Sequence, residues 1–220
     1  MKSEHVRNSK KTTVVLLILF ALVVMAAGIY TSLKKDHQKS VDFAQLNATV
    51  LPQARAIPAF ELTDDEQRPF TQEQLVGQWS LLYFGFTHCA HICPMAMTNL
   101  QQIYQQLVAD QIEPLPQVVL VSVDPQRDTP DVMHQYVKRF NTAFRGVTAS
   151  DTTQLDVLTK PLGIAYFKME SAQGDTNSYS VEHSDSFVLI NPQAELAAFF
   201  TPPHDANLIA NEYALIIANR

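Results

Sequence analysis

The chain is poor in cysteine and, beyond its N-terminus, in basic residues. Cys89 and Cys93 are its only cysteines among 220 residues. A disulfide between them would close a loop of five residues and restrict little of the chain, so a purely structural role is disfavoured. The chain has 16 Lys/Arg and 22 Asp/Glu. Six of the basic residues and one of the acidic residues lie within residues 1–35, which leaves 10 basic and 21 acidic residues in 36–220. This acidic excess argues against binding to nucleic acid and against flat adsorption on an anionic membrane.

The sequence also lacks repeats and low-complexity tracts, and it has one long apolar run, from Val14 to Ile29. This run is long enough to cross a bilayer with help from its flanks, and longer than the apolar core of most cleaved signals. It predicts an uncleaved transmembrane anchor over 13–30, although Ala26-Ala27-Gly28 could serve a signal peptidase. Four Lys/Arg precede the run and three follow it closely, which favours a cytoplasmic N-terminus.

The predicted organisation has four parts. A cytoplasmic leader (1–12) precedes the anchor (13–30), a polar tether (31–54) follows it, and residues 55–220 form one domain outside the cytoplasm. About 165 residues are enough to bury a substantial hydrophobic core. In a bacterial cell this organisation corresponds to a single-pass protein of the inner membrane with its soluble domain in the periplasm.

The domain is predicted to alternate strands and helices. Its strongest strand signals are continuous apolar runs of the kind found in the middle of a parallel sheet. Pro94 suits the first turn of a helix, and Thr129 with Pro130 suits the start of another. The order of strand, helix, strand, helix, then a hairpin and a helix predicts an α/β, thioredoxin-like fold. The predicted elements are strands at 57–64, 79–84, 117–123, 164–169, 186–190 and 196–200, a helical turn at 71–75, and helices at 94–109, 130–140, 151–160 and 205–218.

The two cysteines lie between Gly85 and Pro94, at a predicted junction between a strand and a helix. Such a junction exposes side chains at the edge of a sheet, and a helix N-terminus favours thiolate over thiol. On a regular helix, residues four apart have Cβ atoms about 5–6 Å apart, wider than the roughly 3.5–4.5 Å of a disulfide. Because a loop can close this gap, the pair can either bind a soft metal or oxidise.

Three segments together resemble the SCO/SenC family of copper-binding assembly proteins of cytochrome c oxidase: Gly85 to Pro94, Asp124 to Pro130, and Tyr179 to Ser184. The similarity covers about residues 55–215 in order and spacing. Family members have a thioredoxin-like fold, an N-terminal membrane anchor and one copper ion held by two motif cysteines and a downstream histidine. Carried over residue by residue, the resemblance implies these metal ligands: Cys89, Cys93 and His183.

The implied ligand set agrees with the chemistry of the side chains. Two thiolates and one imidazole form a soft set that suits Cu(I), and the set can hold Cu(II) when water or another donor completes the plane. Zinc also accepts two cysteines and a histidine with a water, so ligand type alone does not exclude it. From its position alone, His183 is more typical of a hydrogen-bonding histidine, so its assignment depends on the resemblance.

One departure from the family lies between the cysteines. The family loop usually reads Cys-Pro-Asp-Val/Ile-Cys-Pro, whereas this chain has Ala90 and His91 in place of proline and aspartate. Loss of the proline loosens the loop, and a protonated imidazole would favour the thiolates further or supply a fourth ligand. His88, His134 and His204 are further candidates, and each of the four histidines is more typical of a solvent-exposed or hydrogen-bonded residue than of a ligand.

Asp124 follows the second core strand, at the carboxyl end where α/β sheets gather functional residues. In the family this element lies near the metal, which implies a role beside the site or in docking a partner. An aspartate that orders its own turn is an equally good interpretation. Arg127 and Asp128 are expected to pair with each other or to cap the next helix.

These observations predict a membrane-anchored copper metallochaperone, not an enzyme. The resemblance implies delivery of copper by ligand exchange to the binuclear copper site in the copper-bearing subunit of cytochrome c oxidase. Other copper chaperones or thiol reductants are the further partners. The alternative is a thiol–disulfide oxidoreductase that reduces the cysteines of that copper site, which a dithiol on a thioredoxin-like fold supports. A peroxiredoxin-type peroxidase is a weaker hypothesis, because neither cysteine lies in its usual motif.

Overall fold

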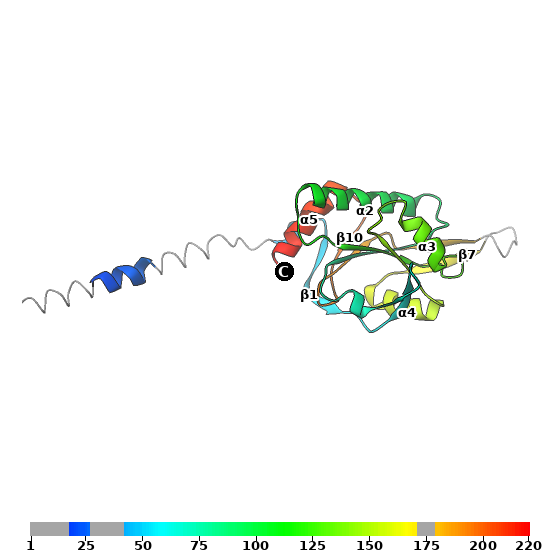
Figure 1. Cartoon of the computed structure of the whole chain (residues 1–220), viewed down its shortest axis with the longest axis horizontal. Helices are drawn as coiled ribbons and strands as arrows, with labels where there is room; N and C mark the ends of the chain where they lie inside the picture. Colours follow the sequence, from blue (N-terminus) through cyan, green and yellow to red (C-terminus); the bar gives the residue numbers. More distant parts are fainter. Residues whose placement is uncertain (1–17, 27–41, 171–178) are drawn as a thin grey trace, which may run out of the picture. The chain divides into compact units, whose positions relative to one another are not determined.

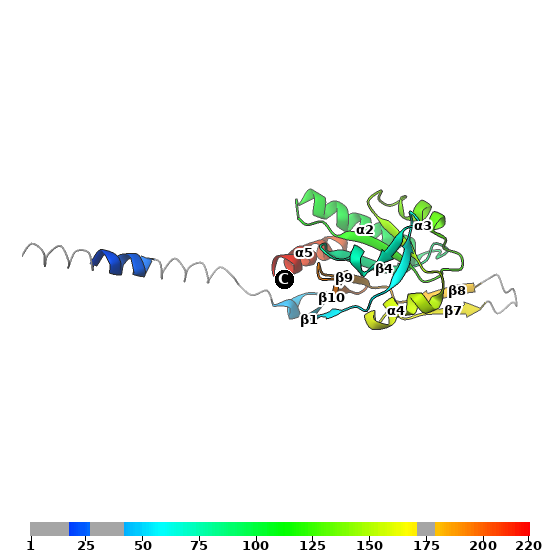
Figure 2. The same cartoon turned by 60° about the horizontal axis from the view of Figure 1, so that its bottom comes forward.

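The computed structural model describes residues 18–26, 42–170 and 179–220 (Figure 1, Figure 2). Residues 18–26 form a helix. Among the described residues, no helix combines the length and apolar character needed to span a bilayer. The rest of the predicted anchor (13–30), the leader (1–12) and the first part of the tether lie outside the described residues. The transmembrane anchor therefore stays a prediction.

The domain is built on a mixed sheet of eight strands in the order β1-β10-β9-β4-β5-β6-β2-β3. β5 runs parallel to its neighbours β4 and β6, whereas all other neighbours are antiparallel. β7 and β8 form a separate antiparallel sheet, the β7–β8 pair. The strands are β1 (Thr49–Ala56), β2 (Glu61–Asp64), β3 (Pro69–Thr71), β4 (Ser80–Gly85), β5 (Gln117–Ser122), β6 (Arg145–Thr148), β7 (Tyr166–Glu170), β8 (Tyr179–His183), β9 (Phe187–Ile190) and β10 (Glu195–Phe200).

The central strands β4 and β5 match the prediction. Every residue of β4 is buried, and in β5 only Gln117 is partly exposed. Parallel strands that are covered on both faces need apolar side chains on both sides, which explains why these two runs do not alternate. Gly85 at the end of β4 is paired with Ser122 at the end of β5. The carboxyl ends of both strands therefore reach the same edge of the sheet.

Helices cover both faces of the sheet. In both views α2 (Ile92–Ala109), α3 (Pro130–Val137) and α5 (Ala206–Ala218) lie on one side and α4 (Thr152–Leu162) on the other (Figure 1, Figure 2). The predicted start of α3 is confirmed, because the Thr129 side chain accepts a hydrogen bond from a backbone N–H of the first turn. The predicted α/β, thioredoxin-like arrangement is confirmed.

Strand β1 lies where the sequence analysis placed part of the tether. Residues 49–54 belong to this strand, which pairs with β10 at one edge of the sheet. None of its side chains is fully buried, so it lacks the apolar alternation of a typical strand. Pro52 lies within a register shift between Val50 and Arg55, and only an edge strand or a bulge tolerates a proline of this kind.

Three other strands were missed for different reasons. β3 and β6 have three and four residues, too few for a pattern to stand out. β8 has one fully buried residue among five, so its sequence predicts no strand and carries only the family motif. Its partner β7 was predicted, but the pairing of the two was not.

A buried carboxylate joins the start of the domain to its last helix. Glu212 on α5 accepts hydrogen bonds from the backbone N–H groups of Asn47 (2.7 Å) and Ala48 (3.0 Å), just before β1. Glu212 is only 3% exposed, so water has little access to replace it. The first strand is therefore fixed to the domain at its entry point.

We predict that Glu212→Ala lowers the free energy of unfolding by about 2–6 kcal/mol, because two N–H groups lose their acceptor at about 1–3 kcal/mol each. Glu212→Gln keeps one acceptor oxygen and should lower the free energy of unfolding by clearly less than Glu212→Ala does. Denaturant unfolding of both variants measures the difference. Equal losses, or none, would contradict the role given to the carboxylate.

Candidate metal centre

The three residues predicted as ligands meet at one point of the structure. The sulfurs of Cys89 and Cys93 and a ring nitrogen of His183 all lie within 4.8 Å of one another. They come from the loop after β4, the first turn of α2 and the end of β8. Cys93 is buried and the other two are partly exposed, so the ligand group is only partly shielded from solvent.

Helix α2 begins at Ile92, two residues before the predicted start at Pro94. Cys93 therefore lies in the first turn of the helix, where its N–H has no helical partner. That N–H donates to Cys89 Sγ at 3.4 Å. The contact agrees with the preference of a helix N-terminus for an electron-rich group. Both cysteines are free thiols.

The Cys93 sulfur lies in an apolar environment. It accepts a backbone hydrogen bond from the Phe86 N–H, at 3.5 Å from Sγ. Burial raises the pKa of the Cys93 thiol, and the Phe86 hydrogen bond offsets this only in part. Because a metal binds the thiolate, a cation at this position would replace the thiol proton and compensate the buried charge.

The His183 ring is fixed in one tautomer. Nδ1 lies 3.1 Å from the Ser184 carbonyl oxygen, which can only accept, so Nδ1 carries the proton and the neutral ring has its lone pair on Nε2. Nε2 lies 3.4 Å from Cys93 Sγ. The rings of Tyr83 and Phe86 contact the imidazole in edge-to-face geometry, with centroids 6.0 and 5.8 Å away. The imidazole thus presents to the sulfurs the nitrogen that a metal can bind.

A glycine makes room for the Cys93 sulfur. A Cβ at Gly85 would lie 2.9 Å from both Cys93 Sγ and Tyr83 Cε1, closer than real contacts of this kind occur. The Tyr83 hydroxyl is buried and has no hydrogen-bond partner in the described part of the chain. Gly85 and Tyr83 therefore form a close-fitting cradle around the sulfur.

The loop before Cys89 is held by Asp128. This carboxylate is fully buried and accepts hydrogen bonds from the Thr87 N–H (3.0 Å), the Thr87 hydroxyl (2.6 Å) and the Ser122 hydroxyl (2.7 Å). Arg127 pairs with Asp124 and Thr129 caps α3, so both expectations for Arg127 and Asp128, pairing with each other or capping the next helix, are wrong. Asp128 instead connects the cysteine loop to the end of β5.

Asp124, which follows β5, contacts the strand that carries His183. One of its carboxylate oxygens accepts from the Tyr179 hydroxyl at 2.7 Å, and the other accepts from Arg127 Nε. The backbone carbonyl of Asp124 closes its own turn by accepting from the N–H groups of Arg127 and Asp128. The residue thus orders its turn and also holds β8, so the two interpretations from the sequence do not exclude each other.

The other candidate histidines do not join the ligand group. His88 and His91 are exposed, and the His91 side chain makes no cap to α2. His134 is bonded to Asp65 at 3.1 Å, and His204 is stacked on a phenylalanine ring. In the described ranges, the group therefore contains three ligands, and the fourth ligand considered at His91 is not among them.

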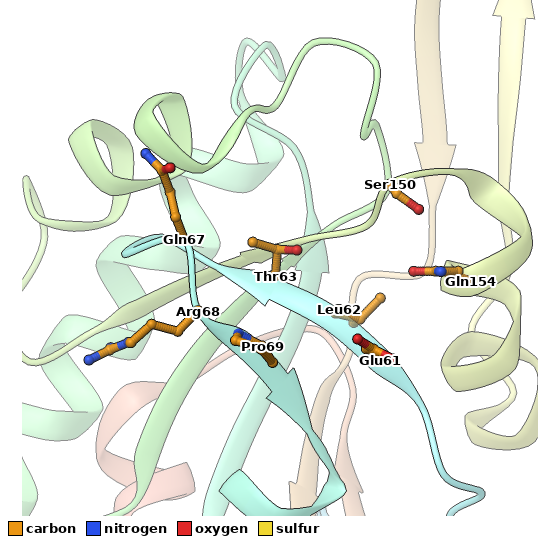
Figure 3. Close-up of a pocket in the computed structure, with 8 residues that line it drawn as sticks. All are labelled: Glu61, Leu62, Thr63, Gln67, Arg68, Pro69, Ser150 and Gln154. Carbon is orange, nitrogen blue, oxygen red and sulfur yellow. The ribbon is translucent and has the colours of Figure 1, made fainter.

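A separate cavity of about 300 Å³ lies along β2 and β3 (Figure 3). Arg68, the cation in its lining, is paired with Asp64 and Glu66 at 2.9 and 2.5 Å, and Figure 3 shows its side chain directed away from the other lining residues. The structure describes all of the residues that line the cavity, and none of them offers a free positive charge to a ligand. None of the predicted metal ligands lines the cavity. Its lining residues are Glu61, Leu62, Thr63, Gln67, Arg68, Pro69, Ser150 and Gln154.

Comparison with known proteins gives one family. The SCO1/SenC family profile matches residues 48–218 of the chain. A protein of Stutzerimonas stutzeri whose name refers to copper binding is 37% identical over 182 residues, which cover 83% of this chain and 86% of the relative. Protein SCO1 homolog 1, mitochondrial, of Arabidopsis thaliana is 31% identical over 199 residues, or 87% of this chain and 58% of the relative.

Solved structures agree with the family match. The crystal structure of Arabidopsis thaliana ScoI with copper bound superposes with a TM-score of 0.68 and is 29% identical in sequence. The likeness covers 74% of this chain and 98% of that one. It extends the agreement from the sequence motifs to the fold that brings them together.

We predict that Gly85→Ala lowers both the stability of the protein and its affinity for a soft metal, because the new Cβ displaces the Cys93 sulfur. Overpacking of a core costs about 1–3 kcal/mol of unfolding free energy. Denaturant unfolding and metal titration of the folded protein measure the two effects.

Gly146→Ala is the matched control. A Cβ there would lie 2.8 Å from Met133 Cβ, at the contact between β6 and α3, so this variant should lose stability and keep its metal affinity. If Gly85→Ala retained the affinity of the unchanged protein, the cradle would have no part in metal binding.

Proposed function

Because the chain belongs to the SCO1/SenC family, we propose that it is a membrane-anchored copper chaperone that serves the assembly of cytochrome c oxidase. Its copper ligands are Cys89, Cys93 and His183. The observation that carries the proposal is the convergence of these ligand atoms within 4.8 Å, although Cys93 and His183 are 90 residues apart in the sequence.

The chemistry of the donors supports copper as the metal. Two thiolates and an imidazole are soft ligands that suit Cu(I), and the same set holds Cu(II) when a further donor completes the plane. Copper is also named for the Stutzerimonas stutzeri relative and is bound in the Arabidopsis thaliana structure. Zinc, which accepts the same ligands with a water, is the competitor that a binding experiment must exclude.

The geometry suits delivery more than permanent storage. Three protein ligands leave a coordination position for a donor from the recipient. Cys89 and His183 are partly exposed whereas Cys93 is buried, so an incoming ligand reaches the first two more easily. We propose the copper-bearing subunit of cytochrome c oxidase as recipient, and other copper chaperones or thiol reductants as upstream partners. Delivery transforms no substrate, so the protein is not proposed to be an enzyme.

The anchor and the compartment are part of the same proposal. Residues 13–30 would hold the domain at the bacterial inner membrane, and the domain would lie in the periplasm. The support is the apolar run from Val14 to Ile29 with more Lys/Arg before it than directly after it. The domain itself then begins at or before β1, because Thr49 already pairs with Phe199 of β10.

Thiol–disulfide exchange is the second candidate function. The observation that favours it is the partly exposed Cys89 sulfur, which receives the Cys93 N–H at the start of α2. Burial, which raises the pKa of Cys93, disfavours that residue as a free thiolate. The same burial is no obstacle to a metal ligand, since the metal itself compensates the charge.

We predict that the reduced protein binds one Cu(I) and that the disulfide form binds none, because an oxidised pair has no thiolate to offer. Copper analysis after gel filtration of both forms, with thiol counting, gives the stoichiometry. Zinc added in excess should not displace the Cu(I). Equal copper content in the two forms would rule out the proposed site.

A second prediction separates metal binding from sulfur chemistry. His183→Ala should lower copper affinity by at least the roughly 10–100-fold that loss of an outer-shell partner costs, while Cys89 and Cys93 still form a disulfide. His91→Ala, which removes an exposed histidine between the same cysteines, is the matched control and should change the affinity far less, because His91 lies outside the ligand group. Competition with a Cu(I) chelator measures the affinities.

The oxidoreductase hypothesis predicts a different result for His183→Ala. In that case His183→Ala would leave copper affinity unchanged and shift the reduction potential of the cysteine pair strongly. A redox titration of the same variants supplies this measurement.

A further inference from the structure

The strand that supplies His183 is not part of the main sheet. In the described structure β8 pairs only with β7, whereas Cys93 lies in α2. No backbone ladder among the described residues therefore fixes the distance between these two ligands. Near the His183 end of β8, the Ser184 N–H donates to the Ala165 carbonyl oxygen, and Val181 within the strand is buried. The contacts of Tyr179 hold the other end of β8 against the turn that follows β5.

Arg127, in the turn between β5 and α3, makes these contacts. Its guanidinium lies 3.7 Å from the centroid of the Tyr179 ring, and its Nη1 donates to the Tyr179 carbonyl oxygen at 3.3 Å. Asp124 closes the arrangement by accepting from Arg127 Nε and from the Tyr179 hydroxyl. Burial and the Asp124 carboxylate raise the pKa of Tyr179 to about 12, so the hydroxyl stays a donor at neutral pH.

The same guanidinium also reaches the cysteine loop. It lies 5.7 Å from the centroid of the Phe86 ring. Phe86 contacts the His183 ring edge-on and donates its N–H to Cys93 Sγ. Arg127 Nη2 is buried without a hydrogen-bond partner within the described ranges, so the guanidinium is held by its Nε and Nη1 bonds and by its contacts with two aromatic rings. One of these rings belongs to the strand of His183 and the other to the loop of the cysteines.

We propose that Arg127 is a positioning residue for the third ligand: it holds β8 against the cysteine loop so that His183 Nε2 faces Cys93 Sγ. This inference rests on the proposed function, since it assigns a role in holding copper. Without the guanidinium, Tyr179 loses the partner of its carbonyl oxygen and one cation over its ring, and it keeps its hydroxyl bond to Asp124 and the Lys168 ammonium 3.6 Å from the ring centroid. β8 is then held less firmly, and the metal keeps its two sulfurs while the imidazole contributes less. Arg127 thus controls the strength of the site without touching the metal.

The planar shape of the guanidinium is essential to this role. A lysine at the same position keeps the positive charge beside Asp124, but it cannot stack flat on Tyr179 or donate from a rigid fork. Arg127→Lys therefore separates the positioning role from a simple requirement for charge.

The test measures copper affinity in Arg127→Ala, Arg127→Lys, His183→Ala and the double alanine variant. We expect Arg127→Ala to lose about tenfold in affinity, as for a lost outer-shell partner, and Arg127→Lys to recover only a minor part. In the double variant the loss should not exceed that of His183→Ala, because Arg127 acts through His183. In the Cu(II) form, the nitrogen hyperfine signal of the imidazole should weaken in Arg127→Ala.

Arg145→Ala is the matched control. Arg145 lies on β6, and its guanidinium is 5.8 Å from the centroid of another aromatic ring, that of Phe70. It should leave affinity and spectrum unchanged. A metal-free measurement completes the test: ¹⁵N relaxation of the β8 amides should report added motion in Arg127→Ala and none in Arg145→Ala.

The possible failures are distinguishable. If the unchanged protein bound no copper, the proposed function would fail, and the relaxation data would still decide whether Arg127 holds β8. If copper bound through His183 but the Arg127 and His183 losses were additive, the positioning role would be overturned. That role would also be overturned if Arg127→Ala left the hyperfine signal and the β8 amides unchanged.

Discussion

The 3.4 Å approach of His183 Nε2 to Cys93 Sγ is the contact on which the rest of the ligand group depends. It joins helix α2 to strand β8, two elements that belong to different parts of the fold. The sulfur can lie at this depth because Gly85 leaves the space that a Cβ would fill. The ring presents the correct nitrogen because the Ser184 carbonyl takes the other one. Gly85 thus sets the space for the sulfur and Ser184 sets the tautomer of the imidazole, so the ligand atoms are in position without a metal.

The different burial of the two cysteines gives them different chemistry. Burial of a neutral thiol requires little free energy, whereas burial of an isolated thiolate requires much. Cys93 therefore becomes a ligand only when a cation compensates its charge. Cys89 is partly exposed and already receives a backbone N–H from the helix start. Under the proposed function, this asymmetry gives copper one deep ligand and two accessible ones. Exchange with a recipient then begins at the accessible ligands while the deep sulfur still holds the metal.

The sequence predicted what local patterns and the family motif encode. The apolar runs of β4 and β5 placed the core, and the motif indicated all three residues that converge. The contacts that hold those residues were not predictable, because they join distant segments: Asp128 reaches the cysteine loop, and Arg127 reaches β8. The start of α2 was misplaced because proline marked the helix start, whereas Cys93 already lies in the first turn. Most of β1 lies in the predicted tether, because an exposed edge strand lacks the apolar alternation that marks a strand.

The central claim is that one copper ion binds to two sulfurs and one imidazole nitrogen that the fold has brought together. X-ray absorption at the copper edge of the Cu(I)-loaded protein tests it most directly, since the scattering shells distinguish sulfur from nitrogen neighbours. The predicted spectrum has two sulfurs and one nitrogen, with the nitrogen shell lost in His183→Ala and kept in His91→Ala. A shell of sulfur alone in the unchanged protein, or a nitrogen shell that survives in His183→Ala, would contradict the claim.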